Sequence, residues 1–239
     1  MSRNNDIVTE LLICDSAAIK LPANARNFLA SAELARLDSM NHPRQATLFL
    51  LGRYLLRRLL AERLQQDPAQ IAIRIDDRGK PQLEPPGWYF NLSHSGHYLA
   101  LAIGNHGDLG VDLESRQLDP AQIQRLARRY LSAPEQQWLA QSAHPTRDFI
   151  RLWTVKEAVL KAGGGGIANN LQRVHWQPDS ATALLDAQPY RLYQYPLGPA
   201  WLTLALGHAG GDPPHRLRPA DLPFDLEITG PQPNLTINP

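Results

Sequence analysis

The spacing of apolar residues predicts two long helices. Along residues 44–66 the apolar positions recur every three or four residues, at Leu48, Leu51, Leu55 and Leu59. A second apolar stripe covers residues 148–162 and stops at four consecutive glycines, Gly163 to Gly166. Glycine commonly follows the last residue of a helix, so we expect the second helix to end there, with the glycines forming a mobile lip.

Shorter apolar runs predict strands. Runs of four to eight residues with alternating or continuous apolar side chains are typical of strands. They occur at residues 11–14, 71–75, 89–103 (as a hairpin), 110–114, 172–176, 190–195 and 201–206. Shorter helices are expected around residues 31–37 and 123–130.

The order of these elements repeats along the chain. The series helix 44–66, strand 71–75 and hairpin 89–103 is followed by helix 148–162, strand 172–176 and hairpin 190–206. The two stretches share negligible sequence identity, so the order of elements alone supports the repeat. We expect an α+β protein, a pseudo-twofold tandem of two similar halves, each a long helix packed on a small antiparallel sheet.

The repeat divides the chain into an N-terminal half-unit, residues 1–108, and a C-terminal half-unit, residues 109–209. The remaining residues, 210–239, are rich in proline and glycine, and we expect an extended tail or wrapping strap there. A length of 239 residues suits one large domain or two units of about 100 residues each.

Composition narrows the functional classes. The 24 basic and 23 acidic side chains leave a net charge of +1, which argues against a dedicated nucleic-acid-binding protein. The apolar runs are shorter than the roughly 20 residues of a membrane helix, and no signal peptide is recognisable, so we expect a cytoplasmic protein without a membrane span. Cys14 is the single cysteine, which excludes an internal disulfide and a cysteine-based zinc cluster.

One face of the second long helix carries unusual chemistry. Trp153, Glu157 and Lys161 are spaced four residues apart and therefore lie along one face. An ordinary interpretation is a solvated Glu–Lys pair, which contributes about 0.2–0.5 kcal/mol. The alternative is a functional row of an aromatic ring, a carboxylate and an ammonium group.

A polar cluster interrupts the apolar hairpin at residues 89–103. It consists of Asn91, Ser93, His94 and Ser95. Polar groups in a core cost free energy unless they are paired. The cluster is either a satisfied structural feature or a compact set of donors for an anion.

Two carboxylates share one side of the strand at residues 110–114. Strand side chains alternate, so Asp112 and Glu114 lie opposite to Val111 and Leu113. Adjacent like charges are destabilising unless the face is wet or a cation lies between them. Mg²⁺ commonly binds one or two carboxylates together with substrate phosphates, so a magnesium site is the alternative to a wet face.

Four motifs together resemble the 4′-phosphopantetheinyl transferase superfamily, in its large two-half, surfactin-synthetase-activating type. They are Gly79-Lys-Pro81, Asn91-Leu-Ser-His-Ser95, Gly110-Val-Asp-Leu-Glu114 and Trp153-Thr-Val-Lys-Glu-Ala-Val-Leu-Lys161. They follow the order and spacing of that family across residues 44–166. The resemblance implies an enzyme that transfers the phosphopantetheine arm of coenzyme A to a serine of an apo acyl or peptidyl carrier protein. The by-product would be adenosine 3′,5′-bisphosphate.

The resemblance also implies roles for individual residues. Asp112, Glu114 and Glu157 would bind Mg²⁺, with Mn²⁺ as an alternative ion. Glu157 would also act as general base, either directly or through water. Lys161 and His94 would contact the pyrophosphate of coenzyme A.

Further residues would bind the rest of coenzyme A. Ser93, Lys80 and Pro81 would line the adenine and phosphate pocket. Arg44 would bind the 3′-phosphate, with Arg74 or Arg78 sharing that task. The roles of Glu135 and Trp153 remain open at this stage.

Two other interpretations compete with an active transferase. One is a catalytically degenerate relative that binds coenzyme A or a carrier protein, and the other is an unrelated α+β domain with chance motifs. The complete set of three acidic positions favours the active enzyme. We expect a monomer with an internal pseudo-dimer and with no nucleic-acid or membrane partner. The sequence does not identify which carrier protein, fatty-acid, polyketide or nonribosomal-peptide, is modified.

Overall fold

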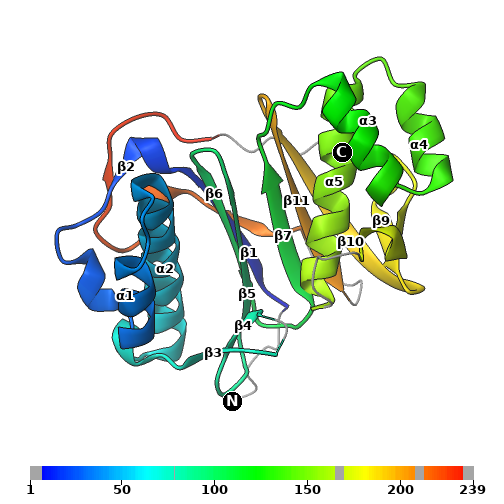
Figure 1. The fold of residues 1–239 in the computed structure, drawn as a ribbon. Coiled ribbons are helices and arrows are strands. Elements are labelled where there is room, and N and C mark those ends of the chain that lie inside the picture. Colours follow the sequence, from blue (N-terminus) through cyan, green and yellow to red (C-terminus); the bar gives the residue numbers. More distant parts are fainter. Residues whose placement is uncertain (1–6, 78, 165–169, 208–212, 234–239) are drawn as a thin grey trace.

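A computed structural model describes residues 7–77, 79–164, 170–207 and 213–233 (Figure 1). Its α-helices are α1 (Ser31–Asp38), α2 (Pro43–Leu64), α3 (Pro120–Tyr130), α4 (Ala133–Ala140) and α5 (Pro145–Ala162). Both predicted long helices are confirmed as α2 and α5. Each begins with a proline, whose fixed φ angle suits the first helical position. The helix α5 ends before Gly163, as its glycine run predicts, whereas Gly165 and Gly166 lie outside the described residues.

The first sheet has the strand order β12-β1-β6-β5. Its strands are β1 (Thr9–Asp15), β5 (Tyr89–Ser95), β6 (Tyr98–Gly104) and β12 (His215–Leu217). The hairpin β5–β6 and the pair β1–β6 are antiparallel, as predicted. The pair β1–β12 is parallel, because β12 is contributed by the proline-rich tail and arrives from the other direction.

The second sheet has the order β7-β11-β10-β9-β8, and all its pairs are antiparallel. Its strands are β7 (Leu109–Glu114), β8 (Val174–Trp176), β9 (Thr182–Leu185), β10 (Gln188–Leu197) and β11 (Ala200–Gly207). The strand β9 was not predicted, because its exposed Leu184 breaks the alternation of apolar and polar side chains. The α+β fold with two similar helix-on-sheet halves is confirmed.

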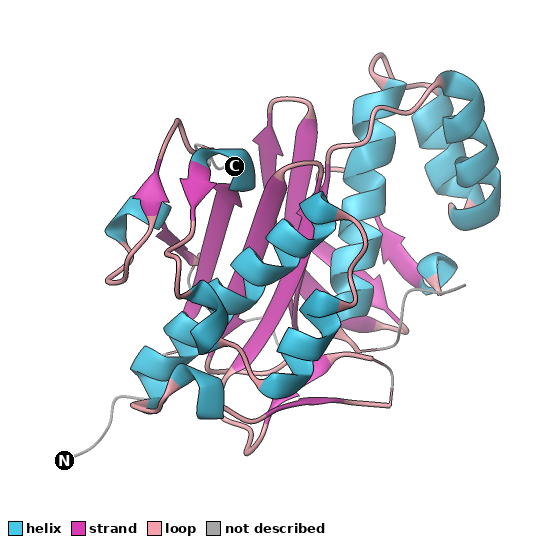
Figure 2. Ribbon diagram, turned by 60° about the vertical axis from the view of Figure 1, so that its left-hand side comes forward, coloured by secondary structure: helices cyan, strands magenta, loops and turns pink. Residues whose placement is uncertain are grey.

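The two sheets lie face to face between the two long helices. In Figure 1 the order across the molecule is α2, first sheet, second sheet and α5, and Figure 2 shows the helices on the outside of the strands. Alternation along β6 explains this layering, since Leu99 and Leu101 pack toward α2 while Ala100 and Ala102 pack toward the second sheet. The small alanines let the two sheets approach closely.

Smaller elements extend the first half. The hairpin of β3 (Ile73–Ile75) and β4 (Pro81–Leu83) forms a separate two-stranded sheet. The predicted strand at residues 71–75 is therefore shorter than expected, and Ile75 is 53% exposed rather than half-buried. This exposure follows from the absence of a third strand beside the hairpin among the described residues.

The tail lies along the first half. Besides β12, it contributes β13 (Glu227–Ile228), which pairs with β2 (Ile19–Lys20). Phe224 packs edge-on against Tyr54 of α2, and the Tyr54 hydroxyl donates to the carbonyl of Asp225 at 3.1 Å. These contacts attach residues 213–233 to the first half. The division into units 1–108, 109–209 and 210–239 stays a prediction.

Each long helix carries one fully buried cation. Arg57 of α2 pairs with Glu33, the third residue of α1, and donates to the carbonyls of Pro68 and Ile71 at 2.5 and 3.1 Å. We call this set of contacts the first clamp.

Lys156 of α5 repeats the arrangement. It pairs with Glu135, the third residue of α4, at 2.8 Å and donates to the carbonyls of Leu171 and Val174 at 3.1 and 2.7 Å. We call this set the second clamp. In both clamps the two carbonyls are three residues apart and flank a short 3₁₀ turn after the long helix. The pseudo-twofold repeat thus extends from the order of elements to a buried polar network.

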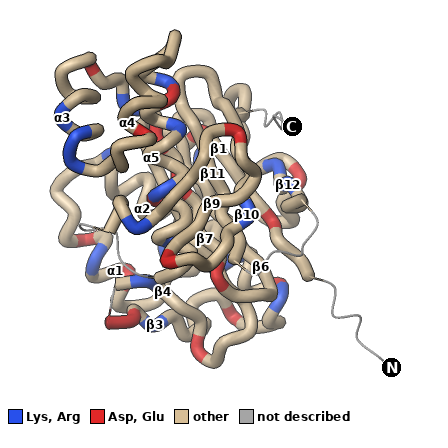
Figure 3. The backbone as a smooth tube through the Cα atoms, turned by 90° about the vertical axis from the view of Figure 1, so that its right-hand side faces the viewer, with Lys and Arg blue, Asp and Glu red and all other residues tan. Residues whose placement is uncertain are grey.

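Charges are interspersed over the molecule. Basic and acidic positions are intermingled over the backbone in Figure 3, and their numbers nearly balance, with a net charge of +1. Within the described ranges, no helix combines the length and apolar character that a bilayer span requires.

The close packing of α5 on β7 requires a glycine. A Cβ atom at Gly110 would stand 2.2 Å from the carbonyl oxygen of Ala158 and 2.4 Å from the amide nitrogen of Ala162. Both neighbours are backbone atoms of α5, so they cannot move aside without displacing the helix. Gly110 therefore sets how closely α5 approaches the strand that carries Asp112 and Glu114.

We predict that Gly110→Ala destabilises the protein by about 3 kcal/mol, because the helix must shift to accommodate the methyl group. Urea denaturation would measure the loss. The matched control is Gly87→Ala, where a Cβ would meet no atom within 4 Å, and it should change stability by less than about 0.5 kcal/mol. Equal effects of the two substitutions would contradict this account.

Candidate functional site

Side chains of β5 complete the hydrogen bonding of β7. Three backbone N–H groups face β5 along the outer edge of β7: those of Val111 and Leu113 in the strand, and that of Ser115 directly after it. They donate to Asn91 Oδ1, Ser93 Oγ and Ser95 Oγ at 2.9, 3.1 and 2.9 Å, respectively. Alternate residues of a strand share one face, so this motif delivers three acceptors to a single edge. The polar cluster of the hairpin is thereby explained as the seam between the two halves.

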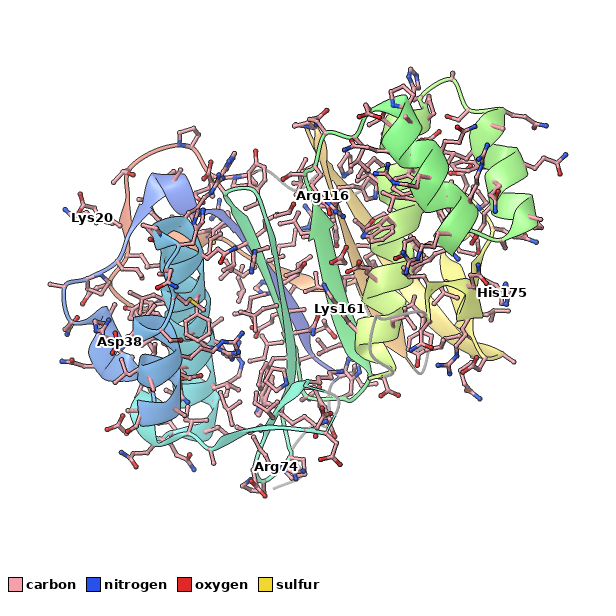
Figure 4. All side chains as sticks on the ribbon, in the orientation of Figure 1. Lys20, Asp38, Arg74, Arg116, Lys161 and His175 are labelled. Atoms are coloured by element: carbon pink, nitrogen blue, oxygen red, sulfur yellow. The ribbon has the colours of Figure 1, made fainter. Side chains whose placement is uncertain are left out.

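The acidic residues of β7 lie beside α5 at this seam. Asp112 is 4% exposed, and its Oδ1 accepts from Lys161 Nζ at 2.6 Å and from Ser93 Oγ at 3.0 Å. Lys161 Nζ lies also 3.3 Å from Ser93 Oγ and from the carbonyl oxygen of Val111. Figure 4 shows Lys161 between α5 and β7, facing the first half. Asp112, Ser93 and Lys161 were all predicted site residues, and the structure brings them into direct contact.

Glu114 is held by a different set of donors. Its Oε1 accepts from Ser95 Oγ at 2.7 Å and from the backbone N–H groups of Ser115 and Arg116 at 2.8 and 2.9 Å. Its Oε2 accepts from Arg116 Nε at 2.6 Å, and Arg116 Nη2 lies at the same distance. Glu114 is 7% exposed, so neither acidic residue lies on the wet face that was one interpretation of the sequence.

Glu157 is the least neutralised carboxylate of the group. Its side chain is 15% exposed, and within the described chain the one basic side chain closer than 4.0 Å is that of Lys161, at 3.9 Å. Burial, followed by repulsion from Asp112, raises the pKa of Glu157 to about 7, although the Lys161 ammonium acts in the opposite direction. Burial likewise raises the pKa of Asp112. The Glu–Lys pair on α5 is therefore part of a half-buried polar site and not a solvated face.

The three carboxylates suit a divalent cation in composition and charge. All are oxygen donors. Burial, and after it repulsion from Asp112, raises the pKa of Glu157, and a bound cation would relieve the repulsion. In the arrangement seen here Lys161 takes the position beside Asp112. Among the described residues, no three His, Cys, Asp or Glu side chains converge closely enough to hold a metal ion. The predicted metal ligands are thus neighbours on one seam without forming a closed metal cluster.

The basic residues predicted to bind phosphate are spread along the seam. His94 is an exposed residue near the end of β5, and partial burial of its side chain, followed by the Lys161 ammonium, lowers its pKa. Arg44 belongs to α2, and its side chain reaches the turn after β5, where its Nη2 is 3.9 Å from the position that a Cβ on Gly96 would take. Arg74 lies on the β3–β4 hairpin, away from Lys161 in Figure 4, and Arg78 is outside the described residues.

Lys80 and Pro81 lie at the opposite end of the seam from Arg44. They line a cavity of about 330 Å³ together with Trp88, Phe90 and Gly163. The Lys80 ammonium donates to the α5 carbonyls of Lys161 and Ala162, at 2.7 and 3.3 Å. Burial lowers the pKa of Lys80. Lys80 therefore ties the carboxyl end of α5 to the first half, a contact that the sequence did not predict.

The structure shows the contacts of Trp153 and Glu135, whose roles the sequence left open. Trp153 packs edge-on against Tyr130 at 5.5 Å and lies under the guanidinium of Arg116 at 5.6 Å, so it belongs both to the core and to the rim of the site. Glu135 is buried in the second clamp with Lys156. Arg116 was missed, since a single arginine after a strand carries no periodic signal. Lys156 was missed because it stands on the buried face of α5, where a cation is not expected.

Fold and site together define a two-half α+β protein with a polar, acidic site on the seam between its halves. Two family models match the chain in succession. One, described as 4′-phosphopantetheinyl transferase, N-terminal, covers residues 22–106, and the other, described as 4′-phosphopantetheinyl transferase superfamily, covers residues 108–195. The chain belongs to the 4′-phosphopantetheinyl transferase superfamily and is an enzyme of that class.

Curated relatives agree with this assignment. The chain is 35% identical over 185 residues to the 4′-phosphopantetheinyl transferase HetI of Nostoc, covering 74% of this chain and 73% of HetI. It is 27% identical over 183 residues to the transferase Sfp of Bacillus subtilis, with 73% and 80% covered. The transferase psf-1 of Bacillus pumilus is 29% identical over 195 residues, with 78% and 82% covered.

We predict that Glu157→Gln stabilises the protein at neutral and alkaline pH. The raised pKa means that ionisation of Glu157 opposes folding, so its wild-type penalty is absent below the ordinary pKa near 4.5 and complete above about 7. The variant removes this penalty, with a gain on the order of 1–3 kcal/mol at pH 8 and none at pH 4.5. Urea denaturation at several pH values measures it. Glu227→Gln, at an exposed ion pair, is the control, and a gain independent of pH would refute the assignment.

Proposed function

We propose that the protein transfers the 4′-phosphopantetheine group from coenzyme A to a serine hydroxyl of an apo carrier protein, with Mg²⁺, and releases adenosine 3′,5′-bisphosphate. Membership of the superfamily supports the reaction class. The observation that carries the residue assignment is the joined set on the seam, in which Lys161 binds Asp112 and lies next to Glu157.

The bond changes fit the charges of the site. The serine oxygen attacks the phosphorus that bears the pantetheine arm, and a new P–O bond forms as the bridging P–O bond of the pyrophosphate breaks. Negative charge then grows on the oxygens of the leaving bisphosphate. The Lys161 ammonium is a donor for those oxygens once it leaves Asp112, and His94 adds a second donor close to it.

Glu157 is the proposed acceptor of the serine proton. A general base works best when its pKa lies near the pH of the reaction, and burial together with Asp112 raises the pKa of Glu157 to about 7. The proton passes from the serine oxygen to this carboxylate, either directly or through one water molecule. Glu157 is suited to this task because its charge is weakly neutralised, whereas Asp112 and Glu114 each form a close ion pair with a basic side chain, Lys161 and Arg116 respectively.

Asp112, Glu114 and Glu157 are the residues that would hold a magnesium ion, with Mn²⁺ as an alternative. Such an ion supplies Lewis-acid stabilisation of pyrophosphate oxygens. The support for this assignment is the concentration of three carboxylates at one seam, where burial, and after it repulsion from Asp112, raises the pKa of Glu157.

Coenzyme A is proposed to lie along the seam. The cavity beside Lys80 and Pro81 is partly lined by aromatic side chains and suits a flat adenine ring. From there the pyrophosphate would run past Ser93 and Lys161. The 3′-phosphate is attached to the ribose beside the adenine, so an adenine next to Lys80 places this phosphate out of reach of Arg44 at the other end of the seam. Arg44 is therefore proposed as the alternative anchor, for a coenzyme A whose 3′-phosphate and adenine lie at that other end, and Arg74 is a weaker candidate because it lies on the separate β3–β4 hairpin.

We predict that Glu157→Gln lowers the transfer rate by about 10²–10³-fold while coenzyme A still binds, because the general base is lost but the phosphate donors remain. Mass spectrometry of a panel of apo acyl and peptidyl carriers, incubated with coenzyme A and Mg²⁺, measures transfer. Calorimetry measures coenzyme A binding. A folded wild-type protein that modifies none of the carriers would favour the degenerate binding module, and a variant with the wild-type rate would exclude Glu157 as base.

Arg116 is predicted to compete with the divalent cation for Glu114. It occupies Oε2 of that carboxylate, and its own side chain is half exposed, so it can leave at low cost. Arg116→Gln should therefore tighten Mn²⁺ binding about 3- to 10-fold, since the carboxylate is freed of an internal counter-ion. Calorimetric titration with Mn²⁺ in the presence of coenzyme A tests this. Arg128→Gln removes a comparable charge from α3 and should leave the affinity unchanged.

A further inference from the structure

The second clamp lies directly behind the proposed general base. Lys156 and Glu157 are consecutive in α5, and their side chains leave the helix about 100° apart. Lys156 is fully buried and bonded to Glu135 and to the carbonyls of Leu171 and Val174, while Glu157 faces the seam. Four segments of chain therefore meet at one ammonium group: α5, the start of α4, and both ends of the 3₁₀ turn after α5.

Such a pair is a weak source of net stability. Burying an ammonium and a carboxylate carries a large desolvation cost, which often cancels their attraction, so apolar residues of similar volume would stabilise the helix equally well. Burial indeed lowers the pKa of Lys156, against the effect of Glu135. The second clamp instead fixes the orientation of α5, because the Glu135 carboxylate and two backbone carbonyls hold the ammonium nitrogen of Lys156 in one position.

The second clamp fixes the rotation of α5 about its own axis. Side chains extend about 5–6 Å from the axis of a helix, so a rotation of about 10° moves a carboxylate by about 1 Å. A displacement of that size can lower the rate of a positioned reaction about 10²-fold. Lys161 stands one turn further along the same face, and its 2.6 Å contact with Asp112 depends on the same rotation.

The first clamp shows what the same device does without a catalytic neighbour. Arg57 has the equivalent buried contacts, but the next residue of α2 is Arg58, whose guanidinium lies 5.0 Å from the ring of Phe28 and 4.9 Å from the ring of Phe224. The residue after Arg57 is thus enclosed by packing against the tail. The residue after Lys156 is the carboxylate of the site.

We propose that Glu135 and Lys156 are positioning residues for the transfer reaction, which fix the orientation of Glu157 and Lys161 toward Asp112. This inference rests on the proposed function of the seam. It assigns a role to Glu135, and it distinguishes the two clamps by what stands next to them.

The test compares Lys156→Met with Arg57→Met. Both variants remove a buried cation from an equivalent network, so both should lower the melting temperature to a similar degree. Lys156→Met is expected to lower kcat about 10- to 100-fold while KM for coenzyme A stays within about threefold. Arg57→Met should keep kcat within about twofold, because no reacting group follows it. Equal losses of kcat in the two variants, or a normal kcat in Lys156→Met, would overturn the proposal.

Two further variants protect the test against misfolding. Lys156→Met/Glu135→Gln removes both charges and leaves no unpaired buried ion, so it should fold more readily and show the same loss of kcat. Lys156→Arg keeps the cation, as Arg57 does in the first clamp, and should retain kcat within about fivefold of the wild type. An inactive Lys156→Arg with wild-type melting temperature would count against a positioning role.

A second readout separates this proposal from the proposed function. If the wild-type protein modifies no carrier, the proposed function fails, but the position of Glu157 can still be measured. Crystal structures of the wild type and of Lys156→Met/Glu135→Gln should differ by about 1 Å or more in the Glu157 carboxylate relative to Asp112. An unchanged carboxylate would refute the positioning role regardless of activity.

Discussion

The unpaired edge of β7 is the constraint on which the site depends. The N–H groups of Val111 and Leu113 in β7, and that of Ser115 directly after it, face the first half, and a buried N–H group without an acceptor costs about 1–3 kcal/mol. The acceptors are side chains of β5, namely Asn91, Ser93 and Ser95, rather than the carbonyls of another strand. Because side chains are longer than a direct backbone contact, the two sheets stay separate and a polar seam remains between them. Asp112 and Glu114 face α5 along this same edge, so the joint between the halves and the candidate site are one structure.

The charges of the seam explain why its parts depend on each other. Asp112 is neutralised by Lys161 and Glu114 by Arg116, whereas the one basic partner of Glu157 in the described chain is the more distant Lys161. Lys161 thus serves two carboxylates, and its release from Asp112 toward a phosphate would change the environment of both. Lys80 adds a mechanical link, because its ammonium holds the last carbonyls of the helix that carries Lys161 and Glu157. Motion of α5 would therefore alter the seam and the cavity beside Lys80 together.

The sequence predicted the elements better than their contacts. The helical spacing of apolar residues extends over enough turns of α2 and α5 to identify both helices. The alternation of side chains along β7 correctly put Asp112 and Glu114 on one side. In β9 the exposed Leu184 breaks the alternation, so this strand was missed. Contacts across the seam could not be predicted, because the bond between Lys80 and the end of α5 joins residues 81 and 82 positions apart. The polar cluster of β5 was visible as an anomaly, but its acceptor role depends on where the edge of β7 lies.

The two clamps show that both halves keep the same type of buried polar network although their sequences share negligible identity. One uses an arginine and the other a lysine, and the two acidic partners belong to different short helices, α1 and α4. What is common is a requirement, since each long helix must be joined to the preceding helix and to the turn that follows it. A single buried cation with three acceptors meets that requirement in both halves. In the sequence each clamp appears only as a single basic residue of a helix. Such a residue is normally assigned to the exposed face, and its burial becomes visible only when the helix is packed. The difference between the halves arises one residue later, where Arg58 packs against the rings of Phe28 and Phe224 and Glu157 faces the seam.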